Sequence, residues 1–189
     1  MRKIISFNHI SLDGFVADEK GELNWVKIDD EIFNFVAKRI LKGDTALYGR
    51  KTYQLMDSYW PKAGENANAT RHEINHSNWY NKTKKIVLSR TLKDDLSTNL
   101  IVINGNHKEN LNKIKEQEGE DILLFGSPSA THSLMDFDLI DGYWLFVNPT
   151  ILGKGIPLFK NINKTNLKLV GSSQQFVSGV TELNYLIER

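Results

Sequence analysis

Three short motifs rich in glycine, hydroxyl and cationic residues follow directly on apolar runs of the chain. They consist of Gly49, Arg50, Lys51 and Thr52, of Ser89, Arg90 and Thr91, and of Gly126, Ser127, Pro128, Ser129 and Ala130. Glycine lets the backbone approach a ligand closely, and the free N–H groups at a helix N-terminus bind phosphate. Arginine offers a forked cation to the same anion. The motifs therefore indicate a dinucleotide site with an additional phosphate, the alternative being that they only mark strand ends.

The segment Gly153–Leu158, Gly-Lys-Gly-Ile-Pro-Leu, does not form the dinucleotide fingerprint Gly-x-Gly-x-x-Gly. The third glycine is missing, Pro157 interrupts the pattern, and no acidic residue follows at about 20 positions. We expect a loop turn here, with Gly153 lining the substrate site.

A further pattern, His72-Glu73-Ile74-Asn75-His76, has the spacing of a zinc protease helix, in which two imidazoles share a face and the glutamate activates water. The flanking residues are polar, whereas that helix normally packs into a core. Lys82 stands where a metzincin has its third histidine. We therefore predict a solvated helix and no metal site.

Reduction of a C=O or C=N bond needs a proton source besides a hydride donor. The candidates are Asp13, Asp30, Asp29 and His9. Each candidate also has a structural interpretation. Asp13 could simply belong to an Asp-Gly turn, Asp29 or Asp30 could cap a helix, and His9 could be a satisfied strand residue. Trp25 can stack on a heterocycle or simply pack against the protein.

The elements that must position these residues follow from the apolar pattern. Short continuous apolar runs, typical of strands covered on both faces, occur at 4–7, 46–48, 86–88, 100–103, 122–125 and 143–147. Helical patterns occur at 32–41, 51–56, 69–80, 109–118 and 129–135. Strands that alternate with helices favour an α/β sandwich with a mainly parallel central sheet.

The C-terminal part of the sequence has a different pattern. Residues 167–170 and 183–187 alternate more clearly between apolar and polar, and a Ser/Gly-rich turn separates them. This predicts an antiparallel edge hairpin. The segment Pro61–Asn68 is predicted to be a loop, and no repeat or second domain is evident, so residues 1–189 are expected to form one domain.

Composition excludes several classes of protein. The chain has 24 Lys and Arg residues against 23 Asp and Glu, which gives no basic surplus for a nucleic acid. It contains no cysteine, so a thiolate zinc site or a cysteine nucleophile is excluded. We see no signal peptide and no apolar run of about 18 residues, so we expect a cytoplasmic protein that is not inserted in a membrane.

The motifs together resemble a known family. Tyr48–Tyr53 and Lys85–Thr91 are similar to two elements of dihydrofolate reductases. Ser11–Ala17, Leu139–Asp141 and Phe146–Gly155 resemble more closely the reductase domain of the bifunctional deaminase–reductases of riboflavin biosynthesis. The similarity covers nearly the whole chain, and no deaminase half is present.

The resemblance implies a dihydrofolate-reductase-like three-layer fold, a homodimer and an NADPH-dependent reductase. Its substrate would be a pyrimidine- or pterin-like small molecule, most closely 5-amino-6-(5-phosphoribosylamino)uracil. The implied cofactor contacts are Gly49–Thr52, Ser89–Thr91 near the adenosine phosphate, and Gly126–Ala130 under the pyrophosphate. Dihydrofolate reductase itself and a nucleotide-binding module without turnover remain alternatives.

Three features depart from the family pattern. Dihydrofolate reductases and many of their relatives have a Gly-Gly pair at the third site, where this chain has Phe125-Gly126-Ser127-Pro128, and the family commonly has glutamate at the position of Gly142. Trp25 and Asp30 have the Trp-x-x-x-x-Asp spacing of dihydrofolate reductases, but Asp30 is further from Gly49 than in those enzymes.

Overall fold

A computed structural model describes residues 1–189. In chain order its elements are β1 (Ile4–Ser11), β2 (Phe15–Ala17), α1 (Asp30–Ile40), β3 (Thr45–Gly49), α2 (Arg50–Ala63), α3 (Arg71–Lys82), β4 (Lys84–Leu88), the 3₁₀ turn η1 (Leu96–Thr98), β5 (Leu100–Ile103), α4 (His107–Lys115), β6 (Ile122–Phe125), α5 (Pro128–Asp136), β7 (Gly142–Asn148), β8 (Ile156–Pro157), β9 (Leu167–Leu169), β10 (Gln174–Gln175) and β11 (Thr181–Ile187).

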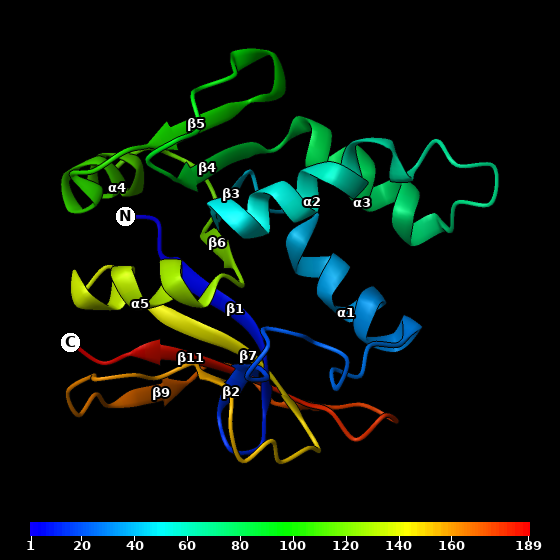
Figure 1. Ribbon diagram of the computed structural model, residues 1–189, viewed down its shortest axis with the longest axis vertical. Helices are drawn as coiled ribbons and strands as arrows, with labels where there is room; N and C mark the ends of the chain where they lie inside the picture. The colour runs from blue at the N-terminus through cyan, green and yellow to red at the C-terminus, as the bar shows by residue number, and fades with distance from the viewer.

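The main sheet has the strand order β10-β11-β7-β1-β6-β3-β4-β5, and β9 pairs with β11 beside this path. The six strands from β7 to β5 in that order are parallel. Strand β11 runs antiparallel to β7, and β9 and β10 run antiparallel to β11. Figure 1 shows this twisted sheet through the middle of the molecule. The predicted parallel sheet with an antiparallel C-terminal edge is thus confirmed.

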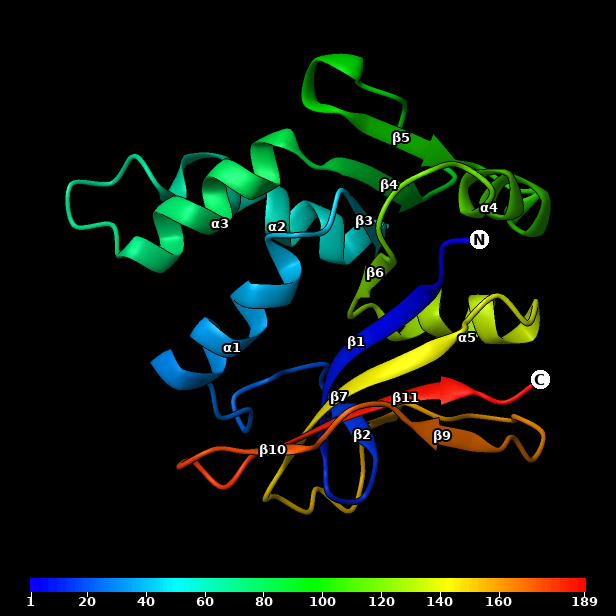
Figure 2. The same cartoon turned by 180° about the vertical axis from the view of Figure 1, so that it is seen from behind.

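Helices cover both faces of the sheet, which makes a three-layer sandwich (Figures 1 and 2). Helices α1, α2 and α3 contribute buried side chains to the cluster on one face, and α4 and α5 contribute to the cluster on the other. Neighbouring residues of a strand alternate between the clusters: Ile4 belongs to the second and Ile5 to the first. Burial on both faces explains why the strands appear in the sequence as continuous apolar runs.

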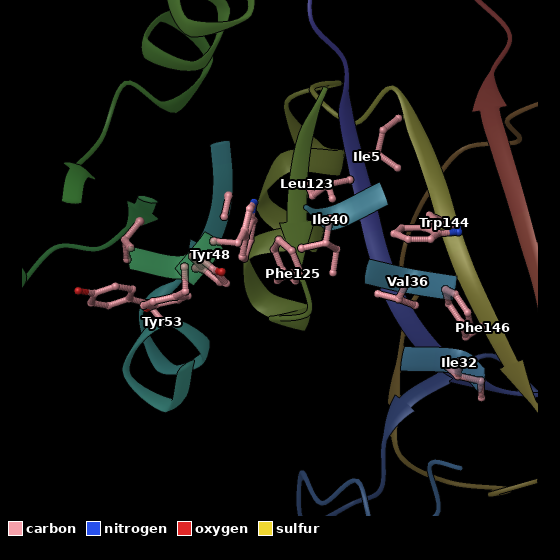
Figure 3. Close-up of a cluster of buried hydrophobic side chains, with 14 of the residues drawn as sticks. Ile5, Ile32, Val36, Ile40, Tyr48, Tyr53, Leu123, Phe125, Trp144 and Phe146 are labelled. Atoms are coloured by element: carbon pink, nitrogen blue, oxygen red, sulfur yellow. The ribbon is translucent and has the colours of Figure 1, made fainter. Parts of the chain in front are cut away.

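Helix α1 shows how the sequence sets one of these layers. The Asp29 side chain caps the helix by accepting a hydrogen bond from the Ile32 N–H at 2.9 Å. Ile32, Val36 and Ile40 repeat every four residues, so they share the buried face. Figure 3 shows them over the sheet side chains, among them Trp144. Each such buried side chain is worth roughly 1.5–3 kcal/mol.

One predicted boundary differs from the structure. Pro61 was expected to open a loop, but α2 continues to Ala63 with Pro61 in its last turn. Proline has no backbone N–H group, so one hydrogen bond of the helix is missing there. Because Pro61 is close to the helix end, few backbone hydrogen bonds follow it that could be disturbed. The buried Ala63 and the contact of α2 with α3 hold this turn in place.

No helix of the structure is both long and apolar enough to cross a membrane.

A second, two-stranded sheet was not predicted. Phe15–Ala17 of β2 pairs antiparallel with Ile156–Pro157 of β8. Both segments are too short to show a period in the sequence. The pairing folds the loop that contains Gly153 back toward the turn after β1.

Candidate functional site at the carboxyl edge of the sheet

The three motifs lie at the same edge of the sheet. In the strand register Gly49 of β3 stands opposite Leu88 of β4, and Leu88 stands opposite Ile103 of β5. Strand β6, which ends at Phe125, lies on the other side of β3. The motifs follow these parallel strands, so they gather at the carboxyl edge, where open α/β sheets bind their ligands.

Two of the motifs are in direct contact. A Cβ atom at Gly49 would overlap the Ser127 hydroxyl and crowd the Ala130 methyl. Gly49 precedes α2, and Ser127 precedes α5. Only glycine at position 49 allows the two helix N-termini to come this close.

The turn before α5 has an unusual backbone. Gly126 has a φ of 50° and Ser127 a φ of 55°, so both residues are left-handed. Glycine adopts this region freely, whereas a side chain makes it unfavourable. A second glycine, at position 127, would be the less strained solution, but this chain holds a serine in the left-handed conformation. Pro128 occupies the first helical position, where a backbone donor is not needed by the helix.

The helices differ in how their N-termini are satisfied. Helices α2, α4 and α5 have no side-chain cap. By contrast, the Asp29 side chain caps α1, and Thr70 caps α3 through a capping box. The first N–H groups of a helix need partners. The two helices that start side by side at the carboxyl edge thus keep free donors and the positive ends of their dipoles for an anion.

The third motif carries an exposed cation on an ordered turn. The buried Ser89 hydroxyl accepts hydrogen bonds from the N–H groups of Thr91 and Leu92 at 3.2 and 3.1 Å. This fixes the turn on which the exposed Arg90 stands. Arg50 and Lys51 are exposed as well, in the first turn of α2.

Strand β1 extends past the end of its neighbour β6. It pairs with β6 only from Ile4 to Phe7, but with β7 as far as Ser11. The Phe7 carbonyl accepts from the Gly126 N–H at 3.2 Å, so the backbone groups of Phe7 point toward β6. The direction of the backbone N–H and C=O groups alternates from one residue of a strand to the next. The backbone groups of His9 therefore point to the same side as those of Phe7, at a level beyond the last residue of β6. Residues 8–11 of β1 therefore have no partner strand on the β6 side, and we call this gap in strand pairing beside the turn at Gly126 the notch.

Asp13 connects two loops of this edge. Its carboxylate accepts from the Leu152 N–H at 3.1 Å, from the Gly153 N–H at 2.7 Å and from the Ser11 hydroxyl at 2.6 Å. The Ser11 bond first, and then the two backbone bonds, hold the pKa of Asp13 below its usual value. A carboxylate stabilised in this way positions the loop, and its low pKa does not favour proton donation. Through Asp13, the loop at Gly153 lies beside the turn after β1.

Asp30 and Trp25 lie at the start of α1 and in the loop before it. Asp29 caps the helix, and the exposed Asp30 carboxylate hydrogen-bonds to no protein group in the structure. The half-buried Trp25 donates its Nε1–H to the Glu22 carbonyl at 3.3 Å. The Lys27 N–H, donating to the buried Asn148 side chain at 2.8 Å, attaches this loop to the end of β7. Neither residue hydrogen-bonds to the motifs around Gly49.

The His-Glu-x-x-His pattern lies on α3, and the prediction that this helix is solvated was wrong, because one face of it is buried at His76, Ser77, Trp79 and Tyr80. Glu73 completes the capping box with Thr70 and accepts from the Tyr59 hydroxyl. His76 packs on the Trp60 ring with centroids 3.9 Å apart. No group of three or more His, Cys, Asp or Glu side chains is arranged to hold a metal ion.

The departure at Gly142 has a steric cause. A Cβ at this position would overlap the Tyr185 carbonyl of β11. The neighbouring Asp141 accepts from the Ile4 N–H at 2.8 Å and pairs with Lys115 and Arg189 at 2.6 and 2.9 Å. These contacts lie at the start of β1 and β7, at the edge opposite the motifs. Asp141 is therefore a structural residue.

Comparison with known proteins agrees with this architecture. The chain is 35% identical over 188 residues to the uncharacterized protein YyaP of Bacillus subtilis (strain 168). The match covers 97% of this chain and 94% of the relative. A structure from Shewanella sp. PV-4, named for riboflavin biosynthesis, superposes with a TM-score of 0.71 at 21% identity over 99% of both chains.

A third comparison concerns a two-activity protein. A diaminohydroxyphosphoribosylaminopyrimidine deaminase/5-amino-6-(5-phosphoribosylamino)uracil reductase of Thermotoga maritima superposes with a TM-score of 0.67 at 17% identity. The match covers 98% of this chain but 56% of the Thermotoga chain. Residues 2–181 match the family described as the RibD C-terminal domain. The chain therefore belongs to the RibD C-terminal domain family.

Proposed function

We propose that the protein is an NADPH-dependent reductase of a pyrimidine- or pterin-like heterocycle, with 5-amino-6-(5-phosphoribosylamino)uracil as the nearest substrate type. Family membership supports the reaction class, since the Thermotoga relative is named for reduction of that uracil. The observation that carries the cofactor assignment is the contact between Gly49 and Ser127, which places two uncapped helix N-termini side by side.

The residues of this junction fit a dinucleotide diphosphate. Backbone N–H groups in the first turns of α2 and α5 would donate to its oxygens, and Gly126, which has no side chain, would let the backbone of the left-handed turn approach them. The guanidinium of Arg50 stands at the same helix start. Arg90, on the neighbouring strand end, is placed for the additional phosphate that distinguishes NADPH from NADH.

NADPH supplies a hydride when bound. The chain contributes position and exclusion of water. The notch beside β1 offers the His9 backbone groups to a planar amide, and Asp13 holds the Leu152–Gly153 loop over the same edge. Asp30, unpaired at the start of α1, is the acid that the folate-reductase alternative would use as proton source.

Calorimetric titration with NADPH and NADH, followed by NADPH oxidation on a panel of substrates, tests the proposal. We expect NADPH binding and turnover of the phosphoribosylaminouracil. Turnover of dihydrofolate alone would identify a dihydrofolate reductase. NADPH binding without oxidation on any pterin or pyrimidine would identify a binding module. Failure to bind NADPH would refute the proposal.

A further inference from the structure

The imidazole of His9 contains a polar atom that the protein leaves unsatisfied. Its Nδ1 is buried and has no hydrogen-bond partner, a state shared with only one other side-chain atom, the Ser178 Oγ. Buried polar groups are nearly always paired, because an unpaired one has lost its water without compensation. An exception needs a cause, and ligand binding is one that the position of His9 supports.

His9 lies on the part of β1 that extends past β6, beside the notch described above. Its side chain is on the face of the sheet covered by α1. Ile5 belongs to the buried cluster on that face, and residues separated by an even number of positions in a strand, here four, point to the same face. The ring stacks on Phe146 with centroids 5.1 Å apart and meets the edge of Phe7 at 6.1 Å. The residue as a whole is half-buried, and its Nδ1 atom is buried.

The surroundings keep this imidazole neutral. Burial lowers the pKa of His9 to about 4, because the charged form loses hydration. A neutral imidazole has one donor and one acceptor nitrogen, which matches the paired N–H and C=O of an amide or lactam. It also avoids repulsion with the positive ring of oxidised nicotinamide.

We propose that His9 is a ligand-contacting residue whose neutral imidazole hydrogen-bonds to the amide- or lactam-type group of a planar heterocycle bound on the α1 face of β1. The group belongs either to the nicotinamide carboxamide or to the pyrimidine lactam. This inference rests on the proposed function and adds a contact that the motifs did not indicate.

Nitrogen-15 NMR of the histidine side chains in the full-length protein tests it directly. Imidazole nitrogen shifts report tautomer and hydrogen bonding, and the other four histidines serve as internal references. We expect NADP⁺ or the phosphoribosylaminouracil, added separately, to shift the His9 nitrogens and leave His76 unchanged. A shift with NADP⁺ assigns the carboxamide, and a shift with the uracil alone assigns the lactam.

Three variants separate contact from packing. His9→Phe keeps an aromatic ring and removes the hydrogen bond, so binding of the shifting ligand should weaken roughly tenfold. His9→Asn restores a polar atom close to the Nδ1 position and should recover most of that loss. The matched control His76→Phe makes the same exchange in the aromatic packing of α3 and should leave affinity unchanged.

The outcomes are distinguishable. If the wild type binds NADPH, but neither ligand moves the His9 resonances and His9→Phe binds both normally, the His9 contact is refuted and the proposed function stands. If the wild type does not bind NADPH, the proposed function is refuted and the His9 contact with it.

Discussion

The carboxylate of Asp13 and the backbone of Gly153 are joined across 140 residues of sequence by a hydrogen bond of 2.7 Å. Asp13 also holds Leu152, so one side chain anchors the loop after β7 to the turn after β1. This relationship separates two roles that sequence could not distinguish. An acid that supplies a proton and an acid that shapes a loop need opposite pKa shifts, and that of Asp13 is lowered.

Asp13→Asn should slow reduction of a good substrate by about 10²-fold, while folding and NADPH affinity stay nearly intact. Asparagine keeps one acceptor oxygen for the loop and loses the other. Steady-state kinetics over a range of pH check the role. If Asp13 positions the loop, the variant keeps the shape of the wild-type pH profile, whereas loss of a limb would show that Asp13 supplies the proton.

Asp30→Asn should leave kcat/KM within about threefold of wild type if the riboflavin-type assignment is correct. Helix α1 keeps its start, because Asp29 is the cap. The matched variant Asp29→Ala should lower the free energy of unfolding by about 1 kcal/mol. A large loss of activity in Asp30→Asn, with Asp13→Asn unaffected, would favour the folate-reductase alternative.

Cofactor preference should depend on Arg90. We expect NADPH to bind more tightly than NADH by ~1–3 kcal/mol, as one charge-assisted contact would give, and Arg90→Ala to remove most of this difference. Lys82→Ala removes an exposed cation just before the opposite end of β4 and is the control. Titration calorimetry measures both affinities. Equal affinities of the wild type for the two cofactors would contradict the prediction.

Ser127→Gly should stabilise the folded protein by about 1 kcal/mol, because glycine relieves the left-handed strain at φ 55°. Ser129→Gly, in the first turn of α5, is the matched control and should destabilise it by ~0.5–1 kcal/mol. Denaturant unfolding measures both. A loss of stability in Ser127→Gly would mean that the serine side chain contributes more than its backbone conformation costs.

Stability should fall as the pH is lowered from about 6.5 toward 4. Burial lowers the pKa of His9 to about 4 and that of His76 to about 3. In the unfolded chain both histidines titrate near 6.5, so the unfolded state binds more protons in this window. Urea unfolding at several pH values should show a smaller decline for His76→Phe than for the wild type. An equal decline would show that His76 is not the cause.

The sequence was sufficient to predict the layers of the fold. Apolar runs such as Ile122–Phe125 are covered on both faces, and the apolar stripe of α1 faces the sheet, so burial follows directly from pattern. The pairing of β2 with β8 was missed because these strands have only three and two residues, too few for an apolar–polar alternation to be recognised. Pro61 was assigned to a loop because a local rule for proline ignores the packing of α2 against α3.

The site was predictable in part. Glycine before a helix indicated the junction, but the contact of Gly49 with Ser127 depends on strand order, which motifs do not encode. His9 was named as a candidate proton donor, with a satisfied strand residue as the alternative. Its Nδ1 has no partner because the ring lies among aromatic side chains, Phe146 and Phe7, and which side chains surround it depends on strand order. The only local sign was a polar aromatic residue two positions before the Ser-Leu-Asp-Gly motif.

The contacts of Asp141 also have a practical consequence for handling the protein. Because Ile4 and Arg189 both bond to this residue, the two ends of the chain leave the molecule together at the amino edge of the sheet, and Figure 2 shows them on one side. A sensor surface, fluorophore or fusion partner attached through either end would thus face away from Gly49 and Ser127. The protein can be immobilised by its termini with the ligand edge open to the solution.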